Sequence, residues 1–335
     1  MDNVLKNARQ FLLDYKLPEA LAGSDVLYYH DTDYHKIQLN NEALANALRN
    51  EILLYGKKLE KDALPLGSSK IYGEPHWPEG WNWPSNSYFI AQFNLAEVQT
   101  YDWEQVLPQK GMLYFFQEDD YSFPDSTYDA VSPLKAFYYQ GSKKQLVQTP
   151  YPKYIKDKAE KEHSDYDFKS VFKAVYQPYF KNYLNFFMHT WYANYDDLLS
   201  GFDEESDLNI FLEDLAQTIS KKFDCTCGVE AASVNEPPEE FWDLGRLDKH
   251  ELSLFGMPFF CQMEAYNHID RIYYEGMDER SETEKQKQAE IYKIPENKIF
   301  LFGRACGEGH SNLFIERRDL EQLKFDNTES WYSGG

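Results

Sequence analysis

Cysteine, long apolar runs and cationic side chains are all scarce in this chain. Its 335 residues include only four cysteines, Cys225, Cys227, Cys261 and Cys306, too few to staple a disulfide-dependent fold. No stretch reaches the roughly 20 consecutive apolar residues of a membrane-spanning helix. Charges interrupt every short apolar run in residues 2–15, which is not the pattern of a signal peptide. We therefore expect a cytoplasmic protein with reduced thiols.

The shortage of positive charge is the strongest global feature. Lys and Arg number 34 against 56 Asp and Glu, which gives a formal net charge of −22. Such a field repels phosphate backbones and anionic lipid headgroups, so we expect neither nucleic acid nor membrane as a partner. It favours a cationic protein partner by electrostatic steering. The alternative is that the charge serves only solubility.

Aromatic side chains are abundant, with 26 Tyr, 23 Phe and 7 Trp. Rings of this size build a large core, and tyrosines beside carboxylates are also typical of recognition surfaces. Two acidic clusters with an adjacent tyrosine are the predicted partner-binding residues: Glu118, Asp119, Asp120, Tyr121, Asp203, Glu204, Glu205 and Asp207. Solvated loops are the competing interpretation for these clusters.

The periodicity of apolar residues predicts the main elements. Helical spacing marks residues 2–15, 41–58 and 208–223, and apolar runs of strand length mark 88–95 and 112–116. Residues 137–139 and 146–147 flank a Gly-Ser pair and predict a hairpin. The aromatic stretch 172–191 fits a helix and a strand equally. Five Gly and Pro residues between 73 and 84 predict an ordered loop, pinned by Trp77, Trp81 and Trp83.

Two halves of the chain echo each other. SKIYGEP at 69–75 parallels LSLFGMP at 252–258, and GMLYFF at 111–116 parallels SNLFIE at 311–316. We expect an α+β fold with antiparallel-rich β-sheets from two related halves, flanked by helices. Residues 1–62 form an N-terminal helical segment in this interpretation, and 63–335 form one domain with halves at about 65–150 and 245–335 and an insertion at 151–244. Chance recurrence of Gly-x-Pro turns is the alternative.

Several of these residues resemble the signature of the YwqG-like family, a broad bacterial group of largely unassigned function. The matching positions, for which the resemblance implies a structural role, are Gly73, Pro75, Trp77, Pro78, Gln92, Gly111, Gly256, Pro258, Gln262, Gly307 and Gly309. Where the family often has Trp-Gly-Asp, this chain has Ala305-Cys306-Gly307-Glu308, and residues 151–200 have no clear counterpart. Members often lie near secreted polymorphic-toxin loci, which implies a role in immunity.

Three groups of residues invite a chemical interpretation. Cys225 and Cys227 are separated by one residue, a poor spacing for structural zinc, and we expect no metal. The turn from Gly307 to Ser311 contains a histidine and a serine, but a tight turn explains its glycines without catalysis. Glu74 and His76 lie in the tryptophan-rich loop, where a ligand pocket and simple ring packing are both possible.

The combined sequence evidence predicts a non-enzymatic protein without a cofactor. We expect an immunity-type protein that binds and occludes a cationic effector toxin, with carboxylates opposing its Lys and Arg. The alternative is a small-ligand-binding protein or an uncharacterised enzyme that uses Glu74, His76 and the 307–311 turn.

Overall fold

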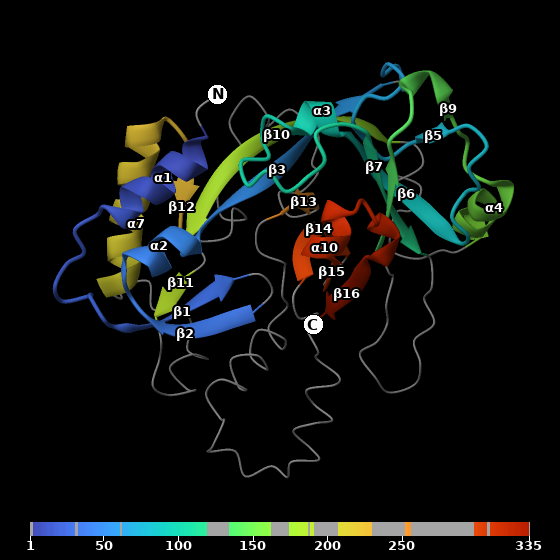
Figure 1. Cartoon of the computed structure of the whole chain (residues 1–335). Coiled ribbons are helices and arrows are strands. Elements are labelled where there is room, and N and C mark those ends of the chain that lie inside the picture. Colours follow the sequence, from blue (N-terminus) through green and yellow to red (C-terminus); the bar gives the residue numbers. More distant parts are fainter. Residues whose placement is uncertain are drawn as a thin grey trace, which may run out of the picture.

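The computed structural model describes residues 3–30, 33–60, 62–118, 134–161, 174–186, 188–190, 207–229, 252–255, 298–306 and 309–334. These residues form a mixed α+β structure in which one large, almost wholly antiparallel sheet is flanked by helices (Figure 1). The predicted α+β, antiparallel-rich fold class is therefore confirmed. No helix among the described residues has the length and apolar character needed to cross a membrane.

The helices are α1 (Val4–Leu13), α2 (Asn41–Ala47), α3 (Leu95–Val98), α4 (Lys153–Lys161), α7 (Asp207–Phe223) and α10 (Arg317–Glu321), with 3-10 helices η1 (Lys143–Gln145) and η4 (Phe325–Asn327). The strands are β1 (Asp25–His30), β2 (Asp33–Gln38), β3 (Leu48–Leu59), β4 (Lys70–Ile71), β5 (His76–Pro78), β6 (Ser87–Asn94), β7 (Met112–Glu118), β8 (Leu134–Tyr139), β9 (Leu146–Gln148), β10 (Val175–Phe186), β11 (Met188–Thr190), β12 (Cys227–Gly228), β13 (Leu252–Leu254), β14 (Lys298–Cys306), β15 (Gly309–Glu316) and β16 (Glu329–Gly334).

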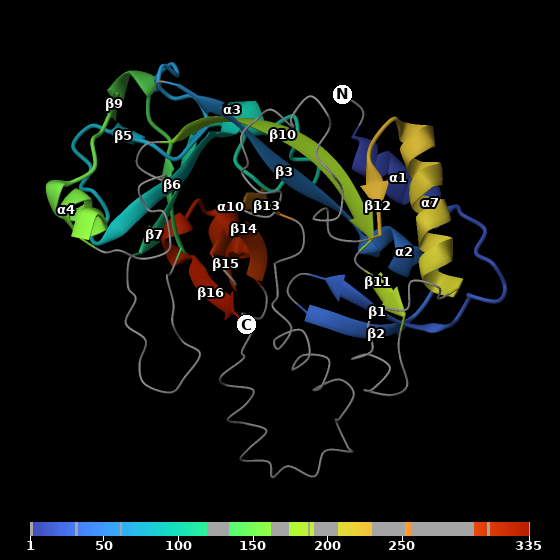
Figure 2. The same cartoon turned by 180° about the vertical axis from the view of Figure 1, so that it is seen from behind.

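The centre of the large sheet is the pair β3 and β10. All twelve residues of each strand are paired, from Leu48 opposite Phe186 to Leu59 opposite Val175. Four strands extend from each side of this pair, in the order β16-β15-β14-β13 on one side and β4-β6-β7-β8 on the other. We call these two groups the second arm and the first arm. Figure 2 shows strands of both arms on the same side of the long central strands β3 and β10.

The two arms agree in detail. Tyr72 and Phe255 follow their first strands with φ angles of 59° and 57°, a left-handed conformation that is rare for aromatic residues. The main-chain N–H of Tyr72 donates to the carbonyl of Ile90 at 2.8 Å, and that of Phe255 donates to Leu301 at 3.4 Å. Ile90 and Leu301 are each the extra residue of a bulge in the next strand. A duplication would leave this correspondence, although the division into two halves and a boundary near residue 62 stay predictions.

The arms close against each other around one apolar core. The rings of Phe115 and Phe302 stack across it with centroids 4.0 Å apart and planes 13° from parallel. At the far edges, the N–H of Leu134 donates to Ser330 Oγ at 2.8 Å, and the rings of Tyr138 and Phe325 lie 5.1 Å apart. The sheet therefore curls until its first and last strands touch.

A second core lies at the other end of β3 and β10. Helices α1, α2 and α7 pack there with the small sheet of β1, β2 and β11 (Figure 1). Asn3 and Asn40 cap α1 and α2, because their side-chain oxygens accept the N–H groups of Lys6 and Ala43. Buried side chains recur at helical spacing on α1 and α7, as the sequence predicts.

Two sequence predictions of local structure are wrong. The helix expected over 41–58 ends at Ala47, and Leu48–Leu59 continues as β3 because pairing with β10 overrides its helical spacing. The hairpin expected between 137–139 and 146–147 does not form: β8 pairs with β7, whereas β9 pairs with β5. The undecided aromatic stretch contains strand β10.

Two glycines provide a test of the turn after β4. Gly73 has φ +70° and an added Cβ would lie 2.5 Å from Val175 Cγ2, whereas Gly80 has φ +82° and nothing within 4 Å. We expect Gly80→Ala to cost about 1 kcal/mol from backbone strain alone. Gly73→Ala adds a steric clash and should cost about 2–4 kcal/mol in total. Urea unfolding measures both, and equal losses would contradict the assigned packing.

Candidate functional site

The loop that follows β4 leads into β5, and His76 at the start of β5 holds it to the first arm. The main-chain N–H of His76 donates to Gln92 Oε1 at 2.7 Å, and the main-chain carbonyl of His76 accepts from the Tyr114 hydroxyl at 2.7 Å. The ring Nδ1 accepts the main-chain N–H of Gly67 at 3.2 Å and lies 3.0 Å from Gln92 Nε2. The proton of the neutral imidazole is therefore on Nε2.

A buried ion pair lies next to these hydrogen bonds of His76. Lys70 is wholly buried, and its Nζ lies 2.5 Å from Asp62 Oδ2, which also accepts from Gln148 Nε2 at 3.1 Å. The other oxygen of Asp62 is buried without a hydrogen-bond partner. Glu74 lies close enough to act on Lys70 electrostatically and forms a 3.7 Å pair with Lys156. We call Asp62, Lys70, Glu74, His76 and Gln92 the polar cluster.

Burial sets the protonation of the polar cluster. It lowers the pKa of Lys70, an effect that the hydrogen bond and charge of Asp62 and the charge of Glu74 only partly oppose. Burial, followed by the positive charge of Lys70, lowers the pKa of His76 to about 4, against the opposing charge of Asp62. His76 is therefore a neutral hydrogen-bonding group at neutral pH and not a cation.

The second arm has the same strand arrangement as the first arm but other residues at the positions of Lys70 and Gln92. Lys70, Gln92 and Tyr114 are neighbours across β4, β6 and β7, and the matching neighbours in β13, β14 and β15 are Ser253, Gly303 and Asn312. A buried lysine costs desolvation energy that a serine or a glycine does not. Its presence in one arm alone marks the polar cluster as the first candidate site.

The structure describes seven of the residues with a predicted structural role, and that role stays a prediction. Gly73 has the left-handed φ described above, Trp77 is buried, and Gln92 holds His76. Gly111 has φ +110°, and a Cβ there would lie 2.6 Å from the Tyr138 ring. Pro75 accepts the Thr149 N–H, Pro78 lies in β5, and Gly309 begins β15. Gly256, Pro258, Gln262 and Gly307 lie outside the described residues.

Most of the predicted partner-binding residues also lie outside the described ranges: Asp119, Asp120, Tyr121, Asp203, Glu204 and Glu205. Glu118 ends β7 and pairs with Lys135 at 2.9 Å. Asp207 is exposed in the first turn of α7. These two residues belong to opposite ends of the described structure, since β7 is in the first arm and α7 packs in the second core with α1 and α2 (Figure 1).

Cys225, Cys227 and Ser311 are described members of the other groups that invite a chemical interpretation. Burial, and then the charge of Asp224, raises the pKa of Cys225 to about 11, and burial also raises that of Cys227. Both are therefore thiols at neutral pH. Ser311 is buried in β15.

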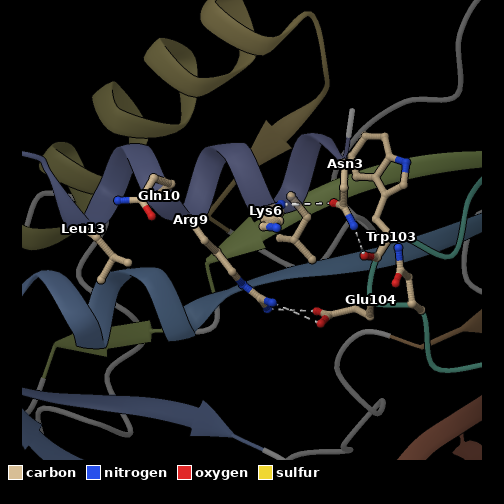
Figure 3. Close-up of a pocket in the computed structure, with 9 residues that line it drawn as sticks. Asn3, Lys6, Arg9, Gln10, Leu13, Trp103 and Glu104 are labelled. Carbon is tan, nitrogen blue, oxygen red and sulfur yellow. Dashed lines mark hydrogen bonds and ion pairs between the residues drawn. The ribbon is translucent and has the colours of Figure 1, made fainter. Parts of the chain in front are cut away.

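A shallow hollow beside α1 is a further candidate (Figure 3). Its volume is about 330 Å³ and its lining includes Arg9, Trp103 and Glu104. Arg9 donates to both carboxylate oxygens of Glu104 and to the Leu48 carbonyl, and Arg49 donates to Glu104 at 3.0 Å. Burial alone would raise the pKa of Glu104, but Arg49 and Arg9 outweigh it and hold the pKa low. The polar groups of Arg9, Arg49 and Glu104 are thus bonded to one another. These bonds hold α1 to the start of β3 and to the segment that contains Glu104.

The buried ion pair should be costly to break but not to replace. We expect Asp62→Asn to destabilise the protein by about 3–5 kcal/mol, because Lys70 is left without its counter-charge. The double variant Lys70→Met with Asp62→Leu should recover to within about 1 kcal/mol of the original protein. Asp157→Asn, which breaks the exposed pair with Lys153, is the matched control and should cost under about 0.5 kcal/mol. Urea unfolding of all three variants decides whether the pair is needed for folding.

His76 should make stability depend on pH. Its folded pKa of about 4 lies below its unfolded value of 6.5, so the unfolded chain binds more protons between these values. Stability is full above pH 6.5 and falls as pH drops towards 4, by on the order of 3 kcal/mol from this residue. His76→Gln should remove that part of the slope. Parallel stability curves for both proteins between pH 4 and 6.5 would contradict the assigned burial.

The comparisons with known proteins place this fold in a family but not in a function. The family model of a domain of unknown function, DUF1963, matches residues 69–333, and these include both arms from β4 to β16. No curated protein matches the chain. The match spans well over half of the chain, and the protein therefore belongs to the DUF1963 family.

Proposed function

We propose that this protein binds and covers a cationic protein in the cytoplasm, and that it acts as an immunity-type inhibitor of an effector toxin without a catalytic step of its own. Carboxylates would oppose the toxin's Lys and Arg, and aromatic side chains would supply the desolvated contacts. The resemblance of the Gly-x-Pro and Gln92 segments to the YwqG-like family supports this role through that family's frequent toxin-linked gene context.

The distribution of charge is the observation that carries the proposal. The described residues contain 25 Asp and Glu against 24 Lys and Arg, so this scaffold is close to neutral. The segments outside the described residues contain 31 acidic and 10 basic side chains. The excess negative charge of the sequence is thus concentrated in residues 119–133, 162–173, 191–206, 230–251 and 256–297. A charge that served only solubility would not need this separation.

Capture of a basic effector is the direct test. We would co-express the chain with the product of a neighbouring gene that encodes a basic, toxin-like domain, then measure growth rescue and the affinity of the purified pair. The triple variant Asp203→Asn, Glu204→Gln and Glu205→Gln should bind at least about tenfold more weakly at low salt, since charged contacts speed capture. Raising the ionic strength should reduce the difference, because salt screens exposed charges.

The matched control changes three exposed carboxylates of the scaffold, with Asp14→Asn, Glu42→Gln and Asp214→Asn. It has the same change in net charge, so an equal loss of affinity would mean that only total charge matters. Absence of both rescue and binding would refute the proposed function.

The second candidate function is ligand binding or catalysis at the polar cluster. It is favoured by the buried lysine that the first arm has and the second arm lacks. The double variant Lys70→Met with Asp62→Leu separates the two functions, because it removes both charges of the buried ion pair and is expected to preserve the fold. Full rescue from the toxin by this variant would exclude the polar cluster from the inhibitory role.

A further inference from the structure

The loop between β5 and β6 exposes a large aromatic side chain on a rigid support. Trp81 is 41% exposed, although a tryptophan gains most from burial. Its ring lies 5.3 Å from that of Trp77, which is buried and itself contacts Tyr114, Phe116 and Phe137. The exposed ring is therefore fixed to the aromatic core beneath it.

Trp81 and Tyr139 form a corner. Their centroids are 5.6 Å apart and their planes are at 90°. The Tyr139 hydroxyl donates to Gln145 Oε1 at 3.0 Å, and the main-chain N–H of Trp81 donates to the Pro78 carbonyl at 3.1 Å. The two rings are thus in edge-to-face contact, with perpendicular planes, and are held in place before any ligand arrives. Such preorganisation lowers the entropic cost of binding.

Glu79 lies two residues before Trp81 in the sequence. Its main-chain N–H donates to the Gln145 carbonyl at 2.8 Å, so the residue that orients Tyr139 also holds the main chain at Glu79. The Glu79 side chain is exposed, and the ion pairs of the described residues do not include it. The cation–π contacts of the described residues involve Lys222 and Arg304, neither of which lies over Trp81 or Tyr139.

We propose that Trp81, Tyr139 and Glu79 form a contact site for an Arg or Lys side chain of a protein partner. A cation is attracted to the negative faces of aromatic rings, most strongly to tryptophan. A guanidinium also stacks flat on one ring while its edge donates to a carboxylate, so Arg fits better than Lys. The identity of the partner rests on the proposed function, whereas the chemistry of the corner does not.

The site explains how a nearly neutral scaffold contributes to capture of a cationic protein. Acidic segments attract such a partner over long range but do not fix its orientation. An exposed tryptophan on a rigid loop is the residue type that dominates interface energetics. Lys143 and Lys144 on η1 are also exposed. Their charges oppose an incoming cation, so the attraction must come from the rings and the carboxylate.

A small cationic probe tests the corner directly. We would titrate the full chain with N-acetyl-arginine amide and follow the amide resonance of Gly80 and the indole resonance of Trp81 by NMR. N-acetyl-norleucine amide, which has a neutral apolar side chain, is the control ligand. We expect saturable shifts with the arginine probe and clearly weaker binding of the norleucine probe. Equal affinity for the two probes, or no shift with arginine, would overturn the proposal.

Variants separate ring chemistry from apolar area. Trp81→Leu retains apolar bulk but removes the aromatic face, and Glu79→Gln removes the charge alone; each should weaken the arginine probe about 2- to 5-fold. Tyr154→Ala removes another exposed ring, on α4, and should leave the affinity unchanged. A Trp81→Leu protein that binds the probe as tightly as the original would also overturn the proposal.

The same variants distinguish failure of this inference from failure of the proposed function. If the effector binds and Trp81→Leu leaves its affinity unchanged, the corner is not a contact site although the inhibitory function stands. If no basic effector binds but the arginine probe does, the corner's preference for cations stands and the immunity function fails.

Discussion

The pairing of β3 with β10 is the constraint on which the rest of the structure depends. Twelve residue pairs hold these strands together, a length of about 40 Å at the usual rise per residue. One end of the pair contributes Leu48, Leu184 and Phe186 to the second core, where α1, α2 and α7 pack. The other end contributes Ile52, Leu54 and Tyr176 to the core between the arms. Because both cores share these two strands, neither forms without the other end of the sheet being in register.

The arms show which features this framework requires and which it only tolerates. Both arms have a left-handed aromatic residue after the first strand and a bulge at Ile90 or Leu301, so these features belong to the framework. Lys70 belongs to one arm alone. Burying an ion pair is often neutral or unfavourable compared with apolar packing, and the matching Ser253 shows that the strand forms without a charge. The polar cluster is therefore best explained by selection for something other than the stability of the sheet.

The sequence was a good guide to elements and a poor guide to their partners. The strands around Phe89 and Leu113 and the helix around Leu212 were predictable from local period alone. The strand at 48–59 was not, because Leu48, Ile52 and Leu53 also match a helix and only the distant β10 decides between the two. The ion pair of Asp62 with Lys70 had no signal, since it depends on how the chain turns between β3 and β4. Gln92 was identified through a family resemblance, but only the structure shows that its side chain accepts the main-chain N–H of His76.

In the proposed capture of a cationic protein, the acidic residues outside the described part of the chain and the aromatic corner would act over two ranges of distance. At an ionic strength near 0.15 M the screening length is about 8 Å, so only charges close to the approaching surface attract it. Carboxylates gathered in a few segments act more strongly at that range than the same number spread over the molecule. Attraction of this kind raises the rate of encounter but discriminates little between one basic protein and another. Discrimination needs fixed, desolvated contacts, and the described surface offers these at Trp81 and Tyr139, whose rings are already held by Trp77 and Gln145. Charge without the aromatic corner would give fast but indiscriminate capture, and the corner without the charge would give a slow association.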